Sequence, residues 1–251
     1  MISRSTVVAR LRAAGCVFAE DEARLLIGAA STSEELAALV DRRVAGLPLE
    51  HVLGWAEFCG LRIAVTPGVF VPRRRTEYLA RQAIKRTSPG AVVVELCCGT
   101  GAIGAAVLST VDGIELHAVD IEPAAVSCAR RNLPNSQVYQ GDLYQPLPEP
   151  LRGRVDVIVA NTPYVPTDEI ALMPAEARLY EPQVALDGGA DGLDIARRVI
   201  GAATGWLAHG GHVLVETSER QAPYLVEEAS GRRARILHSG KFAATIVVAS
   251  R

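Results

Sequence analysis

The chain of 251 residues carries a formal net charge of −2, and 49% of its residues are hydrophobic. This length suits one large domain, or one domain with a small appendage, and the apolar content allows a sizeable core. The nearly neutral charge argues against a chain-wide nucleic-acid surface, although not against a local basic patch. No apolar stretch of about 18 residues is free of charged residues, so the sequence predicts no membrane span.

The cysteines and the N-terminal residues indicate where the protein works. Five cysteines, an odd number, lack the spacing of a metal site, so we expect reduced thiols and no metal. No apolar signal core follows the first four residues, Met-Ile-Ser-Arg. These features predict a cytoplasmic protein.

The first 50 residues are rich in Ala and Leu, and their apolar residues recur at helical spacing, which predicts three helices. Ser31 to Glu35 can cap the third helix, and Gly46 and Pro48 end it. Such a segment is too short to be a robust domain alone. We interpret residues 1–50 as a helical substrate-recognition domain, with a packing appendage as the alternative.

Residues 51–65 predict a β-hairpin with Gly60 at or near its turn, in a linker that runs to residue 71. Pro72 can then begin a helix that extends through Ile84. The three arginines at 73–75 would oppose the positive end of that helix dipole, so an anionic group nearby would offset them. A solvated basic turn is the alternative.

From residue 91, strands and helices alternate. Strands are predicted at 91–95, 114–119, 137–140, 155–160 and 212–216, helices at 123–132, 191–208 and 219–230, and an antiparallel pair at 234–239 and 243–249. The alternation predicts an α/β fold with a doubly wound, mostly parallel seven-stranded sheet, in a domain of residues 72–251.

A loop of small residues, Cys97 to Gly104, follows the first strand and opens a helix. Its G-x-G-x-x-G pattern, with Asp120 placed to hold ribose hydroxyls, is shared by dinucleotide oxidoreductases and by methyltransferases that use S-adenosylmethionine. Two more acids favour the methyltransferase. Glu95, before the loop, could hold the methionine ammonium, and Asp142, after the third strand, could accept from the adenine amino group.

The tetrapeptide Asn161-Thr162-Pro163-Tyr164 follows the apolar strand at 155–160, which Pro163 should end. Ligands of open α/β sheets bind at this end of the strands. The Asn161 side-chain carbonyl and the Thr162 backbone carbonyl could accept both hydrogens of a planar NH2 group, while the Tyr164 ring stacks on its face. A plain strand-to-loop turn is the alternative.

The tetrapeptide resembles Asn-Pro-Pro-Tyr, the signature of methyltransferases acting on planar amino groups. The chain is similar to the protein-(glutamine-N5) methyltransferase family, the HemK-like enzymes that methylate glutamine in release factors or a ribosomal protein. Besides the tetrapeptide, the resemblance includes Gly46–Gly54, Val71–Arg73, Thr76-Glu77, Glu181-Pro182 and a block at 185–193 made of Ala185–Gly189 and Asp191–Leu193. The block at 185–193 is the most family-specific stretch. DNA adenine methyltransferases share a tetrapeptide of the Asn-Pro-Pro-Tyr type but are not expected to have this block.

Four residues depart from the family pattern. Thr162 replaces the first Pro, which keeps the backbone carbonyl but loses the fixed φ and adds an N–H that needs a partner. Cys97 replaces a glycine, so a Cβ must fit beside the cofactor. Arg74 and Arg75 replace Pro and Glu, which turns an acid into a base. These changes preserve the expected reaction and leave the protein substrate open.

The resemblance implies methyl transfer from S-adenosyl-L-methionine, which leaves S-adenosyl-L-homocysteine, to the N5 amide of a glutamine in a protein such as a release factor or ribosomal protein. We expect neither nucleic acid nor membrane as a direct partner. It implies a cofactor site of Arg73, Thr76, Glu95, Cys97, Gly99, Thr100, Gly101, Asp120, Ile121, Asp142, Leu143 and Asn161. It implies substrate contacts from Asn161, Thr162, Pro163, Tyr164, Glu181 and Pro182, with Asn161, Pro163 and Tyr164 as the catalytic set.

Three other functions fit parts of the pattern. A methyltransferase of an RNA or DNA base amino group is supported by the basic turn at 73–75, opposed by the net charge, and would show strongly salt-dependent substrate binding. A non-catalytic binding module could have lost cofactor affinity through Cys97 or Thr162. A dehydrogenase leaves the tetrapeptide unexplained.

Overall fold

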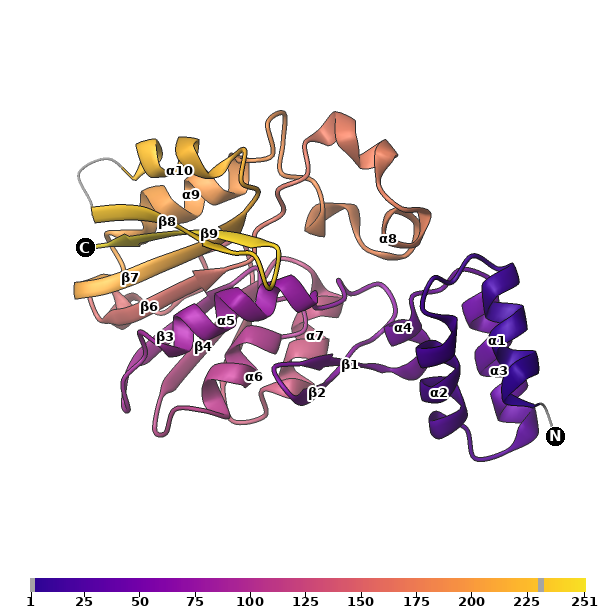
Figure 1. The fold of residues 1–251 in the computed structure, drawn as a ribbon. Helices are drawn as coiled ribbons and strands as arrows, with labels where there is room; N and C mark the ends of the chain where they lie inside the picture. The colour runs from indigo at the N-terminus through magenta and orange to yellow at the C-terminus, as the bar shows by residue number, and fades with distance from the viewer. Residues whose placement is uncertain (1–2, 230–232) are drawn as a thin grey trace.

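The computed structural model describes residues 3–229 and 233–251 of the chain. Its N-terminal helices are α1 Arg4–Ala13, α2 Ala19–Ala29 and α3 Ser33–Val44. They pack around an apolar cluster of their own, beside the sheet domain (Figure 1). The predicted cap of α3 is confirmed, because Thr32 Oγ1 accepts from the Glu35 amide at 3.1 Å and the Glu35 carboxylate accepts from the Ser31 amide at 2.7 Å.

A short helix and a hairpin connect these helices to the sheet. They are α4 Leu49–Leu53, β1 Trp55–Phe58 and β2 Leu61–Ala64. The predicted strand at residues 51–53 is therefore wrong, because the Pro48-led turn continues as helix until Gly54, whose φ of 80° ends it. The hairpin turn lies at Cys59 and Gly60, as predicted, with positive φ at both residues.

The central sheet has the order β5-β4-β3-β6-β7-β9-β8, and β9 runs antiparallel to both of its neighbours. Its strands are β3 Val92–Leu96, β4 Glu115–Asp120, β5 Gln137–Gln140, β6 Val155–Ala160, β7 Leu207–Thr217, β8 Arg233–Ser239 and β9 Ala244–Ser250. Strands β3 to β7 all pair in parallel with one another. This confirms the predicted doubly wound, mostly parallel seven-stranded sheet.

Helices cover both faces of the sheet (Figure 1). One face carries α5 Glu77–Ile84, α6 Ala102–Leu108 and α7 Pro123–Asn132, and the other carries α9 Asp194–Ala203 and α10 Ala222–Glu228. Consecutive strand residues serve opposite layers: Val157 packs with the α5–α7 layer and Ile158 with the α9–α10 layer. The hairpin joins the first layer through Phe58 and Ile63, both buried.

Three predicted helix boundaries are wrong. The arginines at 73–75 do not begin an α-helix, because a 3-10 turn, η1 Arg74–Thr76, precedes α5. The helix predicted at 191–208 is α9, which is shorter at both ends because Gly192 holds a φ of 77° before it and β7 already begins at Leu207. The helix predicted at 219–230 is α10, and its predicted last residue, Ser230, lies outside the described residues.

The loop after β6 contains elements that the sequence pattern did not predict: η3 Thr167–Leu172, α8 Ala175–Tyr180 and η4 Gln183–Ala185. A further 3-10 turn, η2 Glu149–Leu151, precedes β6. Figure 1 shows α8 on the side of the N-terminal helices, and the Tyr180 hydroxyl donates to the Ala45 carbonyl at 3.2 Å. Within the described ranges, no helix is long and apolar enough to cross a membrane.

Candidate active site

A cavity opens at the carboxyl ends of β3, β4 and β6 and brings together most of the residues that the sequence singled out. Only Gly101 and Glu181 of the predicted site residues do not line it. Gly101 begins α6 with a φ of 74°, and a Cβ there would lie 2.7 Å from the Leu133 side chain. Gly101 therefore shapes the loop without facing the cavity.

Glu95 lies at the end of β3 and is 1% exposed. Its carboxylate accepts from the Gly104 amide at 2.8 Å, which fastens the first turn of α6 to the strand. Burial raises the pKa of Glu95 to about 8, although the backbone hydrogen bonds oppose the shift. A cationic ammonium in the cavity would favour the charged form, as the predicted role requires.

The loop after β3 uses left-handed backbone at Cys97 and Gly99, with φ values of 52° and 54°. A left-handed non-glycine residue costs roughly 1–2 kcal/mol, so the glycine that the resemblance leads us to expect in place of Cys97 would avoid this cost. Leu143, after β5, is also left-handed, with a φ of 49°. Three cavity-lining positions thus depend on backbone geometry as much as on side-chain chemistry.

Asp120 ends β4 and holds the glycine-rich loop. Its Oδ2 accepts from the Gly99 amide at 2.7 Å and its Oδ1 from the Glu122 amide at 2.9 Å. Burial raises the pKa of Asp120, and these amides oppose the rise. Because a carboxylate has about four lone-pair sites, Asp120 can still accept from two hydroxyl groups in the cavity.

Asp142 has a partner that sequence reasoning missed. Arg198, on α9, donates to Asp142 Oδ2 at 2.5 Å, and both residues line the cavity. Local sequence patterns do not predict a pair of residues that lie 56 positions apart in the chain. Asp142 keeps its second carboxylate oxygen for a ligand, which is what the predicted adenine contact needs.

The tetrapeptide begins where β6 ends, as Pro163 predicted, and all four residues line the cavity. The Asn161 amide nitrogen donates to Thr76 Oγ1 at 3.4 Å. Asn161 Oδ1 is buried and has no hydrogen-bond partner within the described part of the chain, and the same holds for Thr162 Oγ1. An unpaired buried carbonyl is costly, so its presence beside a cavity marks an acceptor kept for a ligand.

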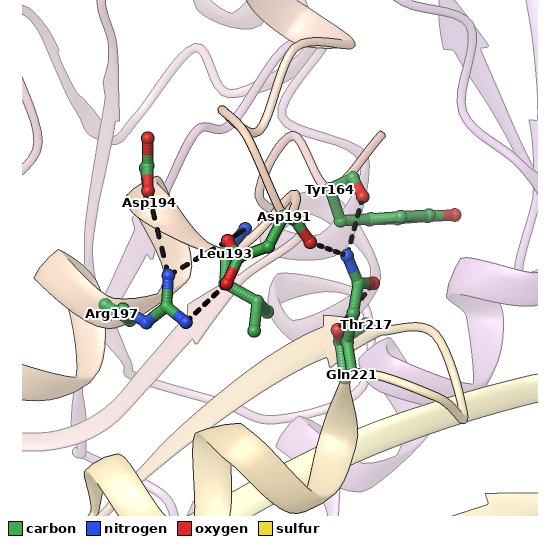
Figure 2. Close-up of polar contacts among 7 residues, drawn as sticks. All are labelled: Tyr164, Asp191, Leu193, Asp194, Arg197, Thr217 and Gln221. Carbon is green, nitrogen blue, oxygen red and sulfur yellow. Dashed lines mark hydrogen bonds and ion pairs between the residues drawn. The ribbon is translucent and has the colours of Figure 1, made fainter. Parts of the chain in front are cut away.

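Gln221, just before α10, holds the last residue of the tetrapeptide (Figure 2). Its Nε2 donates to the backbone carbonyls of Tyr164, at 3.0 Å, and Asp191, at 2.8 Å. Its Oε1 accepts from the hydroxyls of Thr217 and Ser218 at 3.3 and 2.6 Å. Gln221 is 4% exposed and fully hydrogen-bonded, so it fixes the relative position of the tetrapeptide and the family-specific block.

The family-specific block packs directly against the tetrapeptide backbone. A Cβ at Gly188 would lie 2.7 Å from the Pro163 carbonyl, and one at Gly192 would lie 2.2 Å from the Tyr164 carbonyl. Figure 2 also shows Arg197 binding the Asp191 carboxylate, which in turn accepts from the Leu193 amide at 3.1 Å. Gly188 and Gly192 are therefore required by the close approach of two backbones.

The basic turn is neutralised by two buried glutamates. Arg73 donates to Glu181 Oε2 at 2.5 Å, and Glu181 Oε1 accepts from the Val71 amide at 3.0 Å. Arg75 Nε lies 3.4 Å from Glu216 Oε1, and its guanidinium lies 5.6 Å from the Tyr164 ring centre. These glutamates are the anionic groups that we expected near the arginines at 73–75. Glu181 does not line the cavity but holds Arg73 and Val71 in place behind its wall.

These features define a class of protein. Carboxylates at the ends of β3, β4 and β5 match the ammonium, ribose hydroxyls and adenine amino group of S-adenosylmethionine, and the glycine-rich loop lies among them. The sheet order β5-β4-β3-β6-β7-β9-β8 brings these carboxylates to one edge of the sheet. The chain has the features of an S-adenosylmethionine-dependent methyltransferase.

Comparison with known proteins identifies the family. The model of the methyltransferase small domain matches residues 60–187. A release factor glutamine methyltransferase of Geobacter sulfurreducens is 39% identical over 196 residues, covering 75% of this chain and 68% of that protein. One of Moorella thermoacetica is 36% identical over 242 residues, covering 85% and 83%. This chain belongs to the release factor glutamine methyltransferase family.

Solved structures agree on the fold. A methyltransferase of Pyrococcus furiosus superposes with a TM-score of 0.58 at 19% identity, covering 84% of this chain and 98% of that one.

Proposed function

We propose that this chain transfers the methyl group of S-adenosylmethionine to the N5 side-chain amide nitrogen of a glutamine in a peptide chain release factor, and releases S-adenosylhomocysteine. The observation that carries the proposal is the buried Asn161 Oδ1 beside the cavity, which has no hydrogen-bond partner among residues 3–229 and 233–251. The names of the curated relatives supply the substrate class.

The residues assigned to the cofactor are those of the sequence prediction. Glu95 would hold the ammonium, Asp120 the ribose hydroxyls and Asp142 the adenine amino group. Bound there, S-adenosylmethionine supplies an electrophilic methyl group. The chain itself needs no metal in this scheme, because the sulfonium already activates the methyl group.

The chain's main task is to align the glutamine amide, whose nitrogen is a poor nucleophile because its lone pair is delocalised into the carbonyl. Asn161 Oδ1 and the Thr162 carbonyl accept the two amide hydrogens, and the Tyr164 ring, backed by Arg75, packs on the amide plane. Such positioning is worth roughly 7–11 kcal/mol of a barrier. As the nitrogen gains positive charge, the same acceptors stabilise it, and the nitrogen then loses one of its two protons to water, which leaves the neutral N-methyl amide.

The rival substrate, a nucleic-acid base, loses its main support. Arg73 and Arg75 are paired with Glu181 and Glu216, both buried, so two of the three arginines of the basic turn are not free to bind phosphate.

We assign residues 1–50 to recognition of the protein substrate. The contact that supports this role is Arg43, which binds Glu22 of α2 at 2.7 Å and Glu176 of α8 at 3.3 Å. It joins the N-terminal helices to the loop that covers the cavity. The division into 1–50, a linker of 51–71 and a catalytic domain of 72–251 stays a prediction.

The test is methylation of a purified release factor with isotopically labelled methyl donor, followed by mass spectrometry of the labelled peptide. We expect one methyl group on a glutamine side chain, and none when that glutamine is replaced by asparagine. Label on RNA alone, or none on the release factor, would contradict the proposal.

A further inference from the structure

The orientation of the Asn161 side-chain amide is set by two residues outside the tetrapeptide. Asn161 Nδ2 donates to Thr76 Oγ1 at 3.4 Å, and that hydroxyl donates to Glu216 Oε1 at 3.3 Å. The three residues come from the end of β6, the turn η1 and the end of β7. Thr76 is 4% exposed and Glu216 2% exposed, so water does not compete for these contacts.

The direction of the hydrogen bonds follows from the number of hydrogens. An ionised carboxylate only accepts, so the Thr76 hydroxyl donates its single hydrogen to Glu216. The Thr76 oxygen can then only accept from Asn161, and only the NH2 group of Asn161 can donate. The amide carbonyl is left facing away from Thr76, as the buried acceptor without a partner in the described chain.

We infer that Glu216 is a positioning residue, which through Thr76 fixes the Asn161 amide with its carbonyl presented to the substrate. The identity of the substrate amide rests on the proposed function, whereas the orientation of Asn161 does not. Burial raises the pKa of Glu216, whereas Arg75, 3.4 Å away, and the Thr76 hydroxyl oppose the rise and favour the charged carboxylate that the arrangement requires. Without the charge, the same contacts would permit the reversed amide, which offers a donor where the substrate also has donors.

This role differs from the cofactor contact that the sequence predicted for Thr76. A cofactor contact would be lost on replacing Thr76 alone and would not depend on Glu216, which does not line the cavity. In a positioning role, Glu216 acts on Thr76 and Thr76 acts on Asn161, so a change at either residue affects the same Asn161 amide. Changes at Glu216 should then alter the methyl-transfer rate without altering cofactor affinity.

The first measurement reads the amide directly. The chain has three asparagines, so selective 15N-asparagine labelling gives three side-chain amides, and Asn161→Ala identifies the relevant one. We expect the Asn161 amide protons to shift and exchange faster in Glu216→Gln and in Thr76→Val. Thr76→Ser should restore the wild-type signal. Unchanged Asn161 signals in both disruptive variants would overturn the inference, whether or not a substrate has been found.

The second measurement is single-turnover methyl transfer, with cofactor affinity followed by calorimetry. We expect Glu216→Gln to slow transfer by about 10-fold to 100-fold, the range for misplacing one buried acceptor, with cofactor affinity nearly unchanged. In the Asn161→Ala background, Glu216→Gln should cause little further loss, because no amide remains to be oriented. Equal losses in both backgrounds would show that Glu216 acts elsewhere.

Thr87→Val is the matched control. Thr87 is a buried threonine whose hydroxyl donates to the Ala83 carbonyl at 3.0 Å, away from the cavity lining. Its replacement removes a buried hydroxyl of the same kind and should leave the Asn161 signal unchanged. Thermal unfolding of each variant separates a loss of fold from a loss of orientation. A shift of the Asn161 signal in the control would contradict the specific connection to Glu216.

Discussion

Gln221→Glu tests how the catalytic tetrapeptide is held. The change preserves the shape of the side chain and an oxygen for Thr217 and Ser218, but it removes the NH2 group that donates to the Tyr164 and Asp191 carbonyls. Both carbonyls are partly buried, so each one left unpaired costs up to about 1–3 kcal/mol, and the new carboxylate repels both. We expect the free energy of unfolding to fall by about 2–4 kcal/mol.

Catalysis should suffer more than cofactor binding. The Tyr164 carbonyl adjoins the residues that align the substrate, while the proposed cofactor contacts lie at the ends of β3, β4 and β5. We expect methyl transfer to fall at least about tenfold, which corresponds to about 1.4 kcal/mol of misalignment, with nearly unchanged affinity for S-adenosylmethionine.

Urea unfolding, single-turnover transfer and calorimetry give the three quantities. Gln137→Glu, on the exposed face of edge strand β5, is the matched control and should leave all three nearly unchanged. Wild-type stability together with a wild-type transfer rate in Gln221→Glu would refute the reasoning.

Three further predictions follow from the site. Asn161→Ala removes the proposed acceptor for the substrate amide, so methyl transfer should fall by about 100-fold or more. Calorimetry should find cofactor affinity nearly unchanged. A wild-type rate would exclude alignment of the substrate amide by Asn161. Asp120→Ala removes the ribose acceptor and the anchor of Gly99, so cofactor affinity should fall by about 1.5–3 kcal/mol in calorimetry, and an unaltered affinity would show that the site is misassigned. Glu95 in the folded state has a pKa of about 8, above its ordinary value, so the folded state binds the extra proton and stability of the ligand-free protein should decrease as the pH rises from about 4.5 towards 8, by up to about 1.4 kcal/mol per pH unit. Glu95→Gln should remove this part of the pH dependence in urea unfolding, and an identical slope in both proteins would contradict the assignment.

Local patterns predicted much of the sheet. The strands at 137–140 and 155–160 and the helix at 123–132 have the predicted bounds, because each combines an apolar run with a clear stop such as Gly141 or Pro163. Parallel strands bring their carboxyl ends to one edge, so residues that follow different strands were expected to meet there. That rule placed Asp120, Asp142 and Asn161 around one cavity.

The supporting residues could not be predicted because their partners are distant in sequence. Thr76 and Glu216 are 140 positions apart, and Gln221 reaches back 57 positions to Tyr164. No periodicity or turn preference encodes such contacts. Gly188 and Gly192 were visible as part of a motif, but the reason for them, the close approach to the Pro163 and Tyr164 carbonyls, required the structure.

Cys97 has a chemical consequence for how the site responds to oxidants. Burial, together with the nearby Asp120 and Asp142 carboxylates, raises the pKa of the Cys97 thiol far above its usual range. The pKa of the neighbouring Cys98 is raised in the same way. Because the thiolate is the reactive form, both sulfurs are poor nucleophiles even though they line the cavity. We therefore expect both thiols to react slowly with peroxide and with alkylating reagents.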